Sequence, residues 1–246
     1  MTIKTDAIVI KEQATGEQDK LVTLLTREIG VIRAFANGAR NPKNKNVATT
    51  GLLCYSDFSI EKTQKGAYIV KDATAKETFF SLRKDIVSLS LAQYFAELAF
   101  EFSPREERAD EFLSLILNCV YLVAEGKKDN NLIKAAAELR FLSLAGYMPS
   151  LVVCDSCGKY ESETMKFSIS TGKIFCDACE TNEYVIPVSF AVIAAMRHIC
   201  FSEPQKVFSF KLSKSSTEEL CEVTEKYLKA LSGKKYKTLE FYKMMT

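Results

Sequence analysis

Two Cys-x-x-Cys pairs have the residue type and spacing of a metal site. They are Cys154 with Cys157 and Cys176 with Cys179, and eighteen residues separate the pairs. Each short turn brings two sulfurs to one side, and a hairpin predicted for the intervening MKFSISTGKIF would join the two turns. Four thiolates arranged in this way suit tetrahedral Zn²⁺ and leave no open position for water or substrate, so the spacing predicts a structural ion.

Two other interpretations of the cysteines stay open at this stage, a redox dithiol pair and ordinary core packing. The chain lacks the apolar run of about 18 to 20 residues that a membrane span needs, and its first residues lack a signal-peptide pattern. We therefore expect a cytoplasmic protein, in whose reducing environment paired cysteines are more often metal ligands than disulfides. Four further cysteines lie in apolar patterns and are expected to be buried: Cys54, Cys119, Cys200 and Cys221.

A second group of residues has the composition of a nucleic-acid contact. No acidic residue occurs from 29 to 56, and cations and an aromatic ring gather in and after a predicted strand, at Arg33, Phe35, Arg40, Lys43 and Lys45. Single-strand binding proteins place phosphates on cations and stack bases on aromatic rings. The alternative is a solvated loop beside an ordinary barrel core, with the aromatic side chains pointing inward. The turn that starts at Gly38 favours the functional interpretation.

A third basic group lies near the end of the chain. Lys234, Lys235 and Lys237 occur in a stretch without acidic residues. They are candidates for a second phosphate contact, although cations at the C-terminus of a helix are also favoured electrostatically.

The sequence contains no recognisable catalytic machinery. The net charge is +2, and the single histidine, His198, lies in an apolar helical segment where packing is the more common role. Neither a phosphate-binding glycine loop nor a nucleophile elbow is present. We predict that the protein is not an enzyme.

The elements that position these residues are of two kinds. The first 80 residues contain five short strand patterns separated by turn signals, which predicts a five-stranded oligonucleotide-binding (OB) barrel, although periodicity does not exclude an SH3-like barrel. Helical patterns follow at 82–102, at 105–126 with Pro104 in the first turn, and at 130–146. After the cysteine segment, helices are expected at 187–201 and from a capping box at Ser216 to Ser232.

The predicted fold class is therefore α+β, an N-terminal OB barrel followed by a helical domain with an inserted four-cysteine zinc module. The expected divisions are 1–80 for the barrel, 81–150 for the first helical part, 151–185 for the zinc module and 186–246 for the last helical part. The cysteine segment carries six acidic residues against three lysines, so it is a poorer candidate for polyanion binding than the two ends.

The chain resembles the bacterial DNA repair protein family RecO along nearly its whole length. The resemblance is carried by the runs EQDKLVTLLTREIGVIRAFANGAR, AELRFLSLAGYMPSLVVCDSCGK and FSISTGKIFCDAC. The sequence departs from the family after Gly38-Ala-Arg, where Asn41-Pro-Lys replaces the usual Ser and Lys. It also departs at Lys237-Thr-Leu, where the family often has Lys-Ser-Arg.

The resemblance implies a recombination mediator without catalytic turnover. Such a protein binds single- and double-stranded DNA, anneals complementary strands, associates with RecR and contacts the C-terminal tail of single-stranded DNA-binding protein (SSB). It thereby helps RecA to load at SSB-coated gaps. For the tail, the resemblance implies a groove of the helical domain edged by basic residues, with Lys134 and Arg140 as candidates. The alternative function is a zinc-stabilised protein interaction hub with only minor DNA contact.

Overall fold

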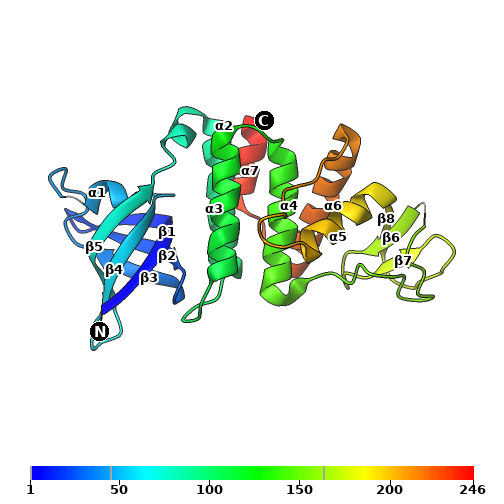
Figure 1. Ribbon diagram of the computed structural model, residues 1–246, viewed down its shortest axis with the longest axis horizontal. Helices are drawn as coiled ribbons and strands as arrows, with labels where there is room; N and C mark the ends of the chain where they lie inside the picture. The colour runs from blue at the N-terminus through cyan, green and yellow to red at the C-terminus, as the bar shows by residue number, and fades with distance from the viewer. Residues whose placement is uncertain (1, 45, 163) are drawn as a thin grey trace. The chain divides into compact units, whose positions relative to one another are not determined.

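The computed structural model describes residues 2–44, 46–162 and 164–246. Its contacts divide the chain into two compact units, which are drawn in Figure 1 and described separately here. Unit 1 consists of residues 1–125 and 236–246, and unit 2 of residues 126–235. The helices that directly follow the barrel in sequence thus belong to the same unit as the barrel. The four domain boundaries expected from the sequence stay a prediction.

Unit 1 contains a closed barrel with the strand order β1-β2-β3-β5-β4. The strands β3 and β5 pair in parallel, and the other neighbours pair antiparallel. A short helix, α1 (Asn46–Thr49), lies between β3 and β4. This confirms the predicted OB barrel. The strands are β1 (Thr2–Thr15), β2 (Asp19–Thr26), β3 (Gly30–Ala36), β4 (Tyr55–Lys62) and β5 (Tyr68–Glu77).

Alternation along the strands determines which side chains fill the barrel. On β3, Ile32 and Ala34 belong to the buried core, whereas Arg33 and Phe35 point to the outside. Val22 and Leu24 of β2 and Ile60 of β4 belong to the same apolar cluster. Because successive side chains point to opposite faces, burial of one face exposes the other.

Four further elements complete unit 1, namely the 3₁₀ turn η1 (Phe80–Lys84), α2 (Ile86–Phe102), α3 (Asp110–Glu125) and α7 (Lys237–Met245). The prediction that Pro104 occupies the first turn of a helix is wrong, because α3 begins only at Asp110. The backbone N–H groups of Glu106 and Ala109 instead donate to the carbonyls of Ile29 and Arg27. Pairing with the β2–β3 turn therefore replaces the helix start.

Unit 2 consists of four helical elements and a three-stranded sheet in the order β7-β6-β8. A helix was predicted to start at Pro187, but this residue lies in β8. The helix predicted to start with a cap at Ser216 is α6, and its capping side chain is instead that of Ser213, which accepts the Ser216 N–H. The elements are α4 (Asn130–Leu142), the π turn η2 (Ser143–Tyr147), β6 (Thr164–Ser168), β7 (Ile174–Cys176), β8 (Val185–Ser189), α5 (Phe190–Phe201) and α6 (Lys214–Ser232).

The hairpin predicted between the cysteine pairs is present. Strands β6 and β7 pair antiparallel, and Gly172 in their turn has a φ of 69° that an L side chain rarely adopts. Among the described residues, no helix combines the length and the apolar character that crossing a membrane requires.

Candidate nucleic-acid interface and metal centre

The outer side of β3 presents a cation and an aromatic ring two residues apart. Arg33 is exposed, and Phe35 keeps 42% of its surface accessible. The strand register places Leu21 of β2 and Ile69 of β5 on either side of Phe35, and both are partly exposed. Phe35 points outward, whereas its neighbours Ala34 and Ala36 point into the core. This removes the alternative in which the Phe35 ring belongs to the core. Phe58, by contrast, points inward and is 2% exposed.

The loop after β3 is fixed to the β1–β2 turn through Arg40. Its backbone N–H donates to the Gln18 carbonyl at 2.8 Å, and its Nη1 donates to the carbonyls of Gly16 and Glu17 at 3.3 and 3.2 Å. The Gly38 N–H donates to Asp19 Oδ1 at 2.7 Å. Arg40 therefore holds the loop in place as well as adding charge to its exposed surface. The sequence predicted the positive charge of Arg40 but not its hydrogen bonds to the β1–β2 turn.

Two other predicted contacts belong to this loop. Lys43 is exposed, and its N–H donates to Asn41 Oδ1 at 3.1 Å, which orders the turn that carries it. Lys45 lies outside the described residues. Arg33 and Phe35 thus lie on β3, and Arg40 and Lys43 lie on the loop that follows it. We call these four residues the β3 face.

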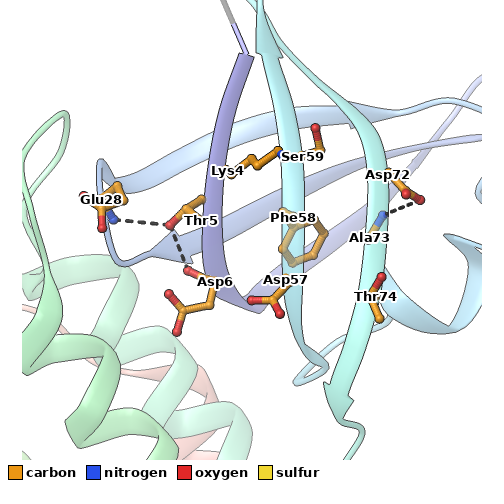
Figure 2. A pocket seen from close by; sticks show the side chains of 10 residues that line it. All are labelled: Lys4, Thr5, Asp6, Glu28, Asp57, Phe58, Ser59, Asp72, Ala73 and Thr74. Carbon is orange, nitrogen blue, oxygen red and sulfur yellow. Dashed lines mark hydrogen bonds between the residues drawn. The ribbon is translucent and has the colours of Figure 1, made fainter.

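A groove on other strands of the barrel is lined by several carboxylates. It is lined by residues of β1, β4 and β5 and of the β2–β3 turn, and Figure 2 shows the carboxylates of Asp6 and Asp57 on adjacent strands, with Asp72 on β5. Lys4 is the only cation among the ten described residues that line it. Three of its carboxylates are paired with cations, Asp6 with Arg27, Glu28 with Arg108 and Asp57 with Lys76. With Lys4 as the one cation among these lining residues, the groove offers a polyanion less positive charge than the β3 face.

An ion-pair network lies beside this groove. The Arg27 guanidinium donates to both carboxylate oxygens of Asp6 at 2.8 Å, and the Tyr55 hydroxyl donates to the same carboxylate. Burial by itself raises the pKa of Asp6, but these hydrogen bonds outweigh it and lower the pKa to about 2. Arg27 also reaches Asp110 of α3 at 3.3 Å, so the network ties the barrel to a helix within unit 1.

The C-terminal lysines lie on different elements. Lys234 and Lys235 are exposed just after α6, whose C-cap is Gly233, whereas Lys237 is exposed in the first turn of α7. Favourable interaction with a helix C-terminus therefore explains the first two lysines but not the third. Their role as phosphate contacts stays a prediction.

Lys134 and Arg140 are both engaged inside unit 2. The Lys134 ammonium, in a residue 2% exposed, donates to Glu138 at 3.1 Å and to Glu225 at 2.7 Å. The Arg140 guanidinium donates to the carbonyls of Ile199 and Cys200. These contacts join α4 to α6 and to α5. A partner-binding role for the two residues stays a prediction.

The four clustered cysteines form a compact metal-ligand set. Their sulfurs all lie within 4.8 Å of one another, and the Sγ atoms of Cys157 and Cys176 are 3.7 Å apart. A tetrahedron with metal–sulfur bonds of about 2.3 Å has sulfur–sulfur edges of about 3.8 Å. The site therefore fits a tetrahedral ion, and the spacing alone was sufficient to find it.

Hydrogen bonds set unequal proton affinities within the cluster. Burial raises the pKa of the Cys154 thiol, but backbone N–H groups, first among them that of Cys176 at 3.3 Å, outweigh it and lower the pKa to about 6. The sulfurs of Cys176 and Cys157 raise the pKa of Cys179 to about 12. Because metal binding requires thiolates, a bound cation would displace the proton of Cys179.

Arg197 of α5 fastens the first cysteine turn to the helices of unit 2. Its guanidinium donates to the carbonyls of Leu151, Val152 and Tyr160 at 2.7, 3.1 and 2.8 Å and lies 4.2 Å from the centre of the Tyr160 ring. Sequence reasoning missed this residue, because a single arginine in an apolar helix carries no signal of which distant carbonyls it meets.

Comparisons with known proteins cover nearly the whole chain. Residues 1–79 match the family described as Recombination protein O N terminal, and residues 83–240 match Recombination protein O C terminal. A DNA repair protein RecO from Acetivibrio thermocellus is 34% identical over 99% of this chain and 97% of its own length. Proteins with the same name from Alkaliphilus metalliredigens and Symbiobacterium thermophilum are 27% and 29% identical, over 93% and 96% of this chain and 93% and 94% of their own lengths. The chain belongs to the RecO family.

Proposed function

We propose that the protein acts in DNA repair and recombination by binding single- and double-stranded DNA through the β3 face. The observation that carries this proposal is the outward direction of Arg33 and Phe35 on one strand of a closed OB barrel, beside the basic loop that Arg40 anchors. Cations there neutralise phosphates, and the exposed ring offers a stacking surface for a base. The groove of β1, β4 and β5, with one lysine among its lining residues, offers a polyanion less positive charge than the β3 face.

The proposed role includes annealing of complementary strands in the cytoplasm and helping RecA to load, together with RecR, at gaps coated by SSB. Family membership supports these partners. We further propose that the protein works without catalytic turnover. His198, the one histidine, has a ring nitrogen 2.8 Å from the Lys206 carbonyl and packs on Phe210, as a packing residue would.

For the metal we propose structural Zn²⁺ held by Cys154, Cys157, Cys176 and Cys179. An all-thiolate tetrahedral set selects soft ions, and all four ligand positions are filled by protein. Metal analysis of the purified protein should then find one zinc per chain. Iron with visible absorbance, or no metal after purification without chelators, would contradict this assignment.

The DNA-binding proposal is tested with Arg33→Gln/Lys43→Gln. Arg40 is left intact because its loss would also release the loop. Fluorescence anisotropy with labelled oligo(dT) should show binding that weakens with salt, and the variant should lower the slope of log K against log salt by about 1.4, since each single-strand phosphate contact contributes about 0.7. The affinity should fall for all sequences alike, because phosphates carry no base information.

The control is Lys211→Gln/Lys214→Gln, which removes the same charge from exposed positions of unit 2. It should leave the salt slope unchanged. Equal effects of the two double variants would show that the β3 face is not the contact, and absence of salt-dependent binding by the unmodified protein would refute DNA binding and favour the protein interaction hub.

A further inference from the structure

We propose that Phe80, Arg83 and Lys84 form a second contact for single-stranded DNA, separate from the β3 face. The inference rests on the proposed DNA-binding function and adds a site to it. These residues belong to η1 in unit 1, directly after the last strand of the barrel. The ligand they suit is an unpaired nucleotide, with its base on the ring and its phosphate on the cations.

The backbone before η1 separates two consecutive phenylalanines. Phe79 adopts the left-handed conformation (φ 46°, ψ 44°), which is unfavourable for a residue with a large side chain. One carboxylate oxygen of Glu77 holds this turn by accepting the N–H groups of Thr78 and Phe79, both at 2.9 Å. The result is that Phe79 is buried at 7% exposure while Phe80 is 61% exposed.

A functional role for the exposed Phe80 ring would explain why the fold keeps Phe79 in an unfavourable backbone conformation. An unstrained turn could bury both rings or carry a polar side chain at position 80, so burial of Phe79 does not by itself require the strain. Residues held in sparsely populated backbone conformations cluster at binding and active sites. The exposed ring is thus a position that the fold maintains against an unfavourable backbone conformation.

Two cations accompany the ring. The Arg83 guanidinium carbon lies 6.0 Å and the Lys84 Nζ 5.9 Å from the centre of the Phe80 ring. Within the described part of the chain, neither cation takes part in an ion pair. Glu77 accepts the backbone N–H groups described above, and Asp85 caps α2 by accepting from Val87 and Ser88. The charges of Arg83 and Lys84 therefore remain available to an anion.

The combination of an accessible ring and two available cations distinguishes among ligands. An apolar protein surface would bury both charges without neutralising them, which is unfavourable. A duplex offers phosphates but keeps its bases stacked internally, so the ring would add nothing to its binding. Single-stranded DNA uses both features, because base stacking on an aromatic side chain and phosphate neutralisation act together.

The absence of tryptophan from the chain allows a direct test. Phe80→Trp introduces a single fluorescent reporter at the proposed contact, and oligo(dT) should quench it as a base stacks on the indole. Tyr121→Trp is the matched control, because Tyr121 is 55% exposed on α3 of the same unit and no described cation lies over its ring. Its fluorescence should change little in the same titration.

Affinity measurements complete the test. Phe80→Ala should weaken binding of oligo(dT) by roughly 5- to 150-fold, the range for loss of one stacked base, and should affect a duplex of the same length far less. Arg83→Gln/Lys84→Gln should lower the single-strand salt slope by about 1.4, whereas Lys211→Gln/Lys214→Gln should not. Because all these side chains are exposed, the melting temperature should stay unchanged, which excludes misfolding as the cause.

The outcomes separate this inference from the proposed function. If oligo(dT) binds the protein but Phe80→Trp is quenched no more than Tyr121→Trp, and Phe80→Ala binds normally, the second contact is refuted while DNA binding stands. Equal losses for single strands and duplex would refute the stacking role of Phe80. If the unmodified protein does not bind DNA at all, both the proposed function and this inference fail.

Discussion

At the scale of single residues, the same charge type has different roles in different surroundings. Arg33 is exposed on β3, whereas Arg40 is tied to two carbonyls and Arg27 to the Asp6 carboxylate. Only the first can be removed without also releasing a structural contact. Mutational tests of DNA binding must therefore separate charge that faces solvent from charge that holds the fold.

The Asp6–Arg27 pair gives a testable pH dependence. The pKa of Asp6 is lowered from 3.8 to about 2 in the folded protein, so the folded state binds its proton less readily than the unfolded state. The pair therefore stabilises the protein fully above about pH 4, and this contribution disappears as the pH falls from there through about 2. Asp6→Asn should lower the free energy of unfolding by about 1 to 2 kcal/mol at pH 7, after allowance for partial solvent screening.

Urea unfolding of wild type and variant between pH 7 and pH 3 measures this difference, which should shrink toward the acid end. Asp57→Asn is the control, since Asp57 pairs in register with Asp6 on the adjacent strand but forms an exposed ion pair with Lys76. Its effect should stay below about 1 kcal/mol. A difference for Asp6→Asn that does not change with pH would contradict the assigned role of the pair.

At the scale of elements, short connections determine how the strands and helices of unit 1 meet. Gly30 begins β3 with a φ of 62°, and its N-terminal neighbour and Val31 form hydrogen bonds with the segment at Pro104–Glu106. A Cβ built on Gly30 would lie 2.2 Å from the Pro104 carbonyl oxygen. The close approach of two backbones is therefore possible only with glycine at this position.

Gly30→Ala should lower the free energy of unfolding by about 3 kcal/mol or more, because the methyl group meets backbone atoms that cannot move without breaking the docking of that segment. Gly66→Ala is the matched control, as Gly66 has a φ of 81° in the β4–β5 turn but nothing within 4 Å of the added atom. It should cost only the conformational strain, about 1 to 2 kcal/mol. Chemical denaturation of both variants measures the contrast, and equal losses would show that the close approach is unimportant.

At the scale of the whole molecule, the proposed tasks lie in different units. The β3 face and η1 belong to unit 1, and the four-cysteine cluster belongs to unit 2. Within unit 2, the cysteine turns connect to the hairpin β6–β7, to β8 and, through Arg197, to α5. A metal there is expected to stabilise the fold of unit 2 without being needed to form the DNA contact in unit 1.

Cys176→Ser, or removal of the metal with a chelator, should therefore lower thermal stability before it affects DNA binding. A loss of about 2 kcal/mol lowers the melting temperature of a unit of this size by about 10 °C. Calorimetry, metal analysis and anisotropy at about 20 °C, well below the melting range of ordinary domains, measure the three properties on the same sample. Cys221→Ser, outside the cluster, should keep the metal. Loss of DNA binding with an unchanged melting temperature would instead show that the metal site contacts DNA.

Features that depend on local spacing could be predicted from the sequence. The four-cysteine set, the hairpin between its pairs and the five-stranded barrel were predicted correctly, because ligand spacing and period-two alternation are written in consecutive residues. Errors occurred where distant partners compete with local preference. Pro104 signals a helix start, but the carbonyls of Arg27 and Ile29 take the backbone N–H groups of that segment.

Which side chains are available to a ligand depends on the folded structure. The sequence cannot distinguish Phe35 from Phe58, yet one points outward from the barrel and the other into its core. It likewise gives no reason to separate Arg40, which is held by carbonyls of another turn, from Arg33. Exposure and pairing, as for the Arg40 side chain on the carbonyls of Gly16 and Glu17, depend on contacts between residues far apart in the chain, and only folding brings those contacts into existence.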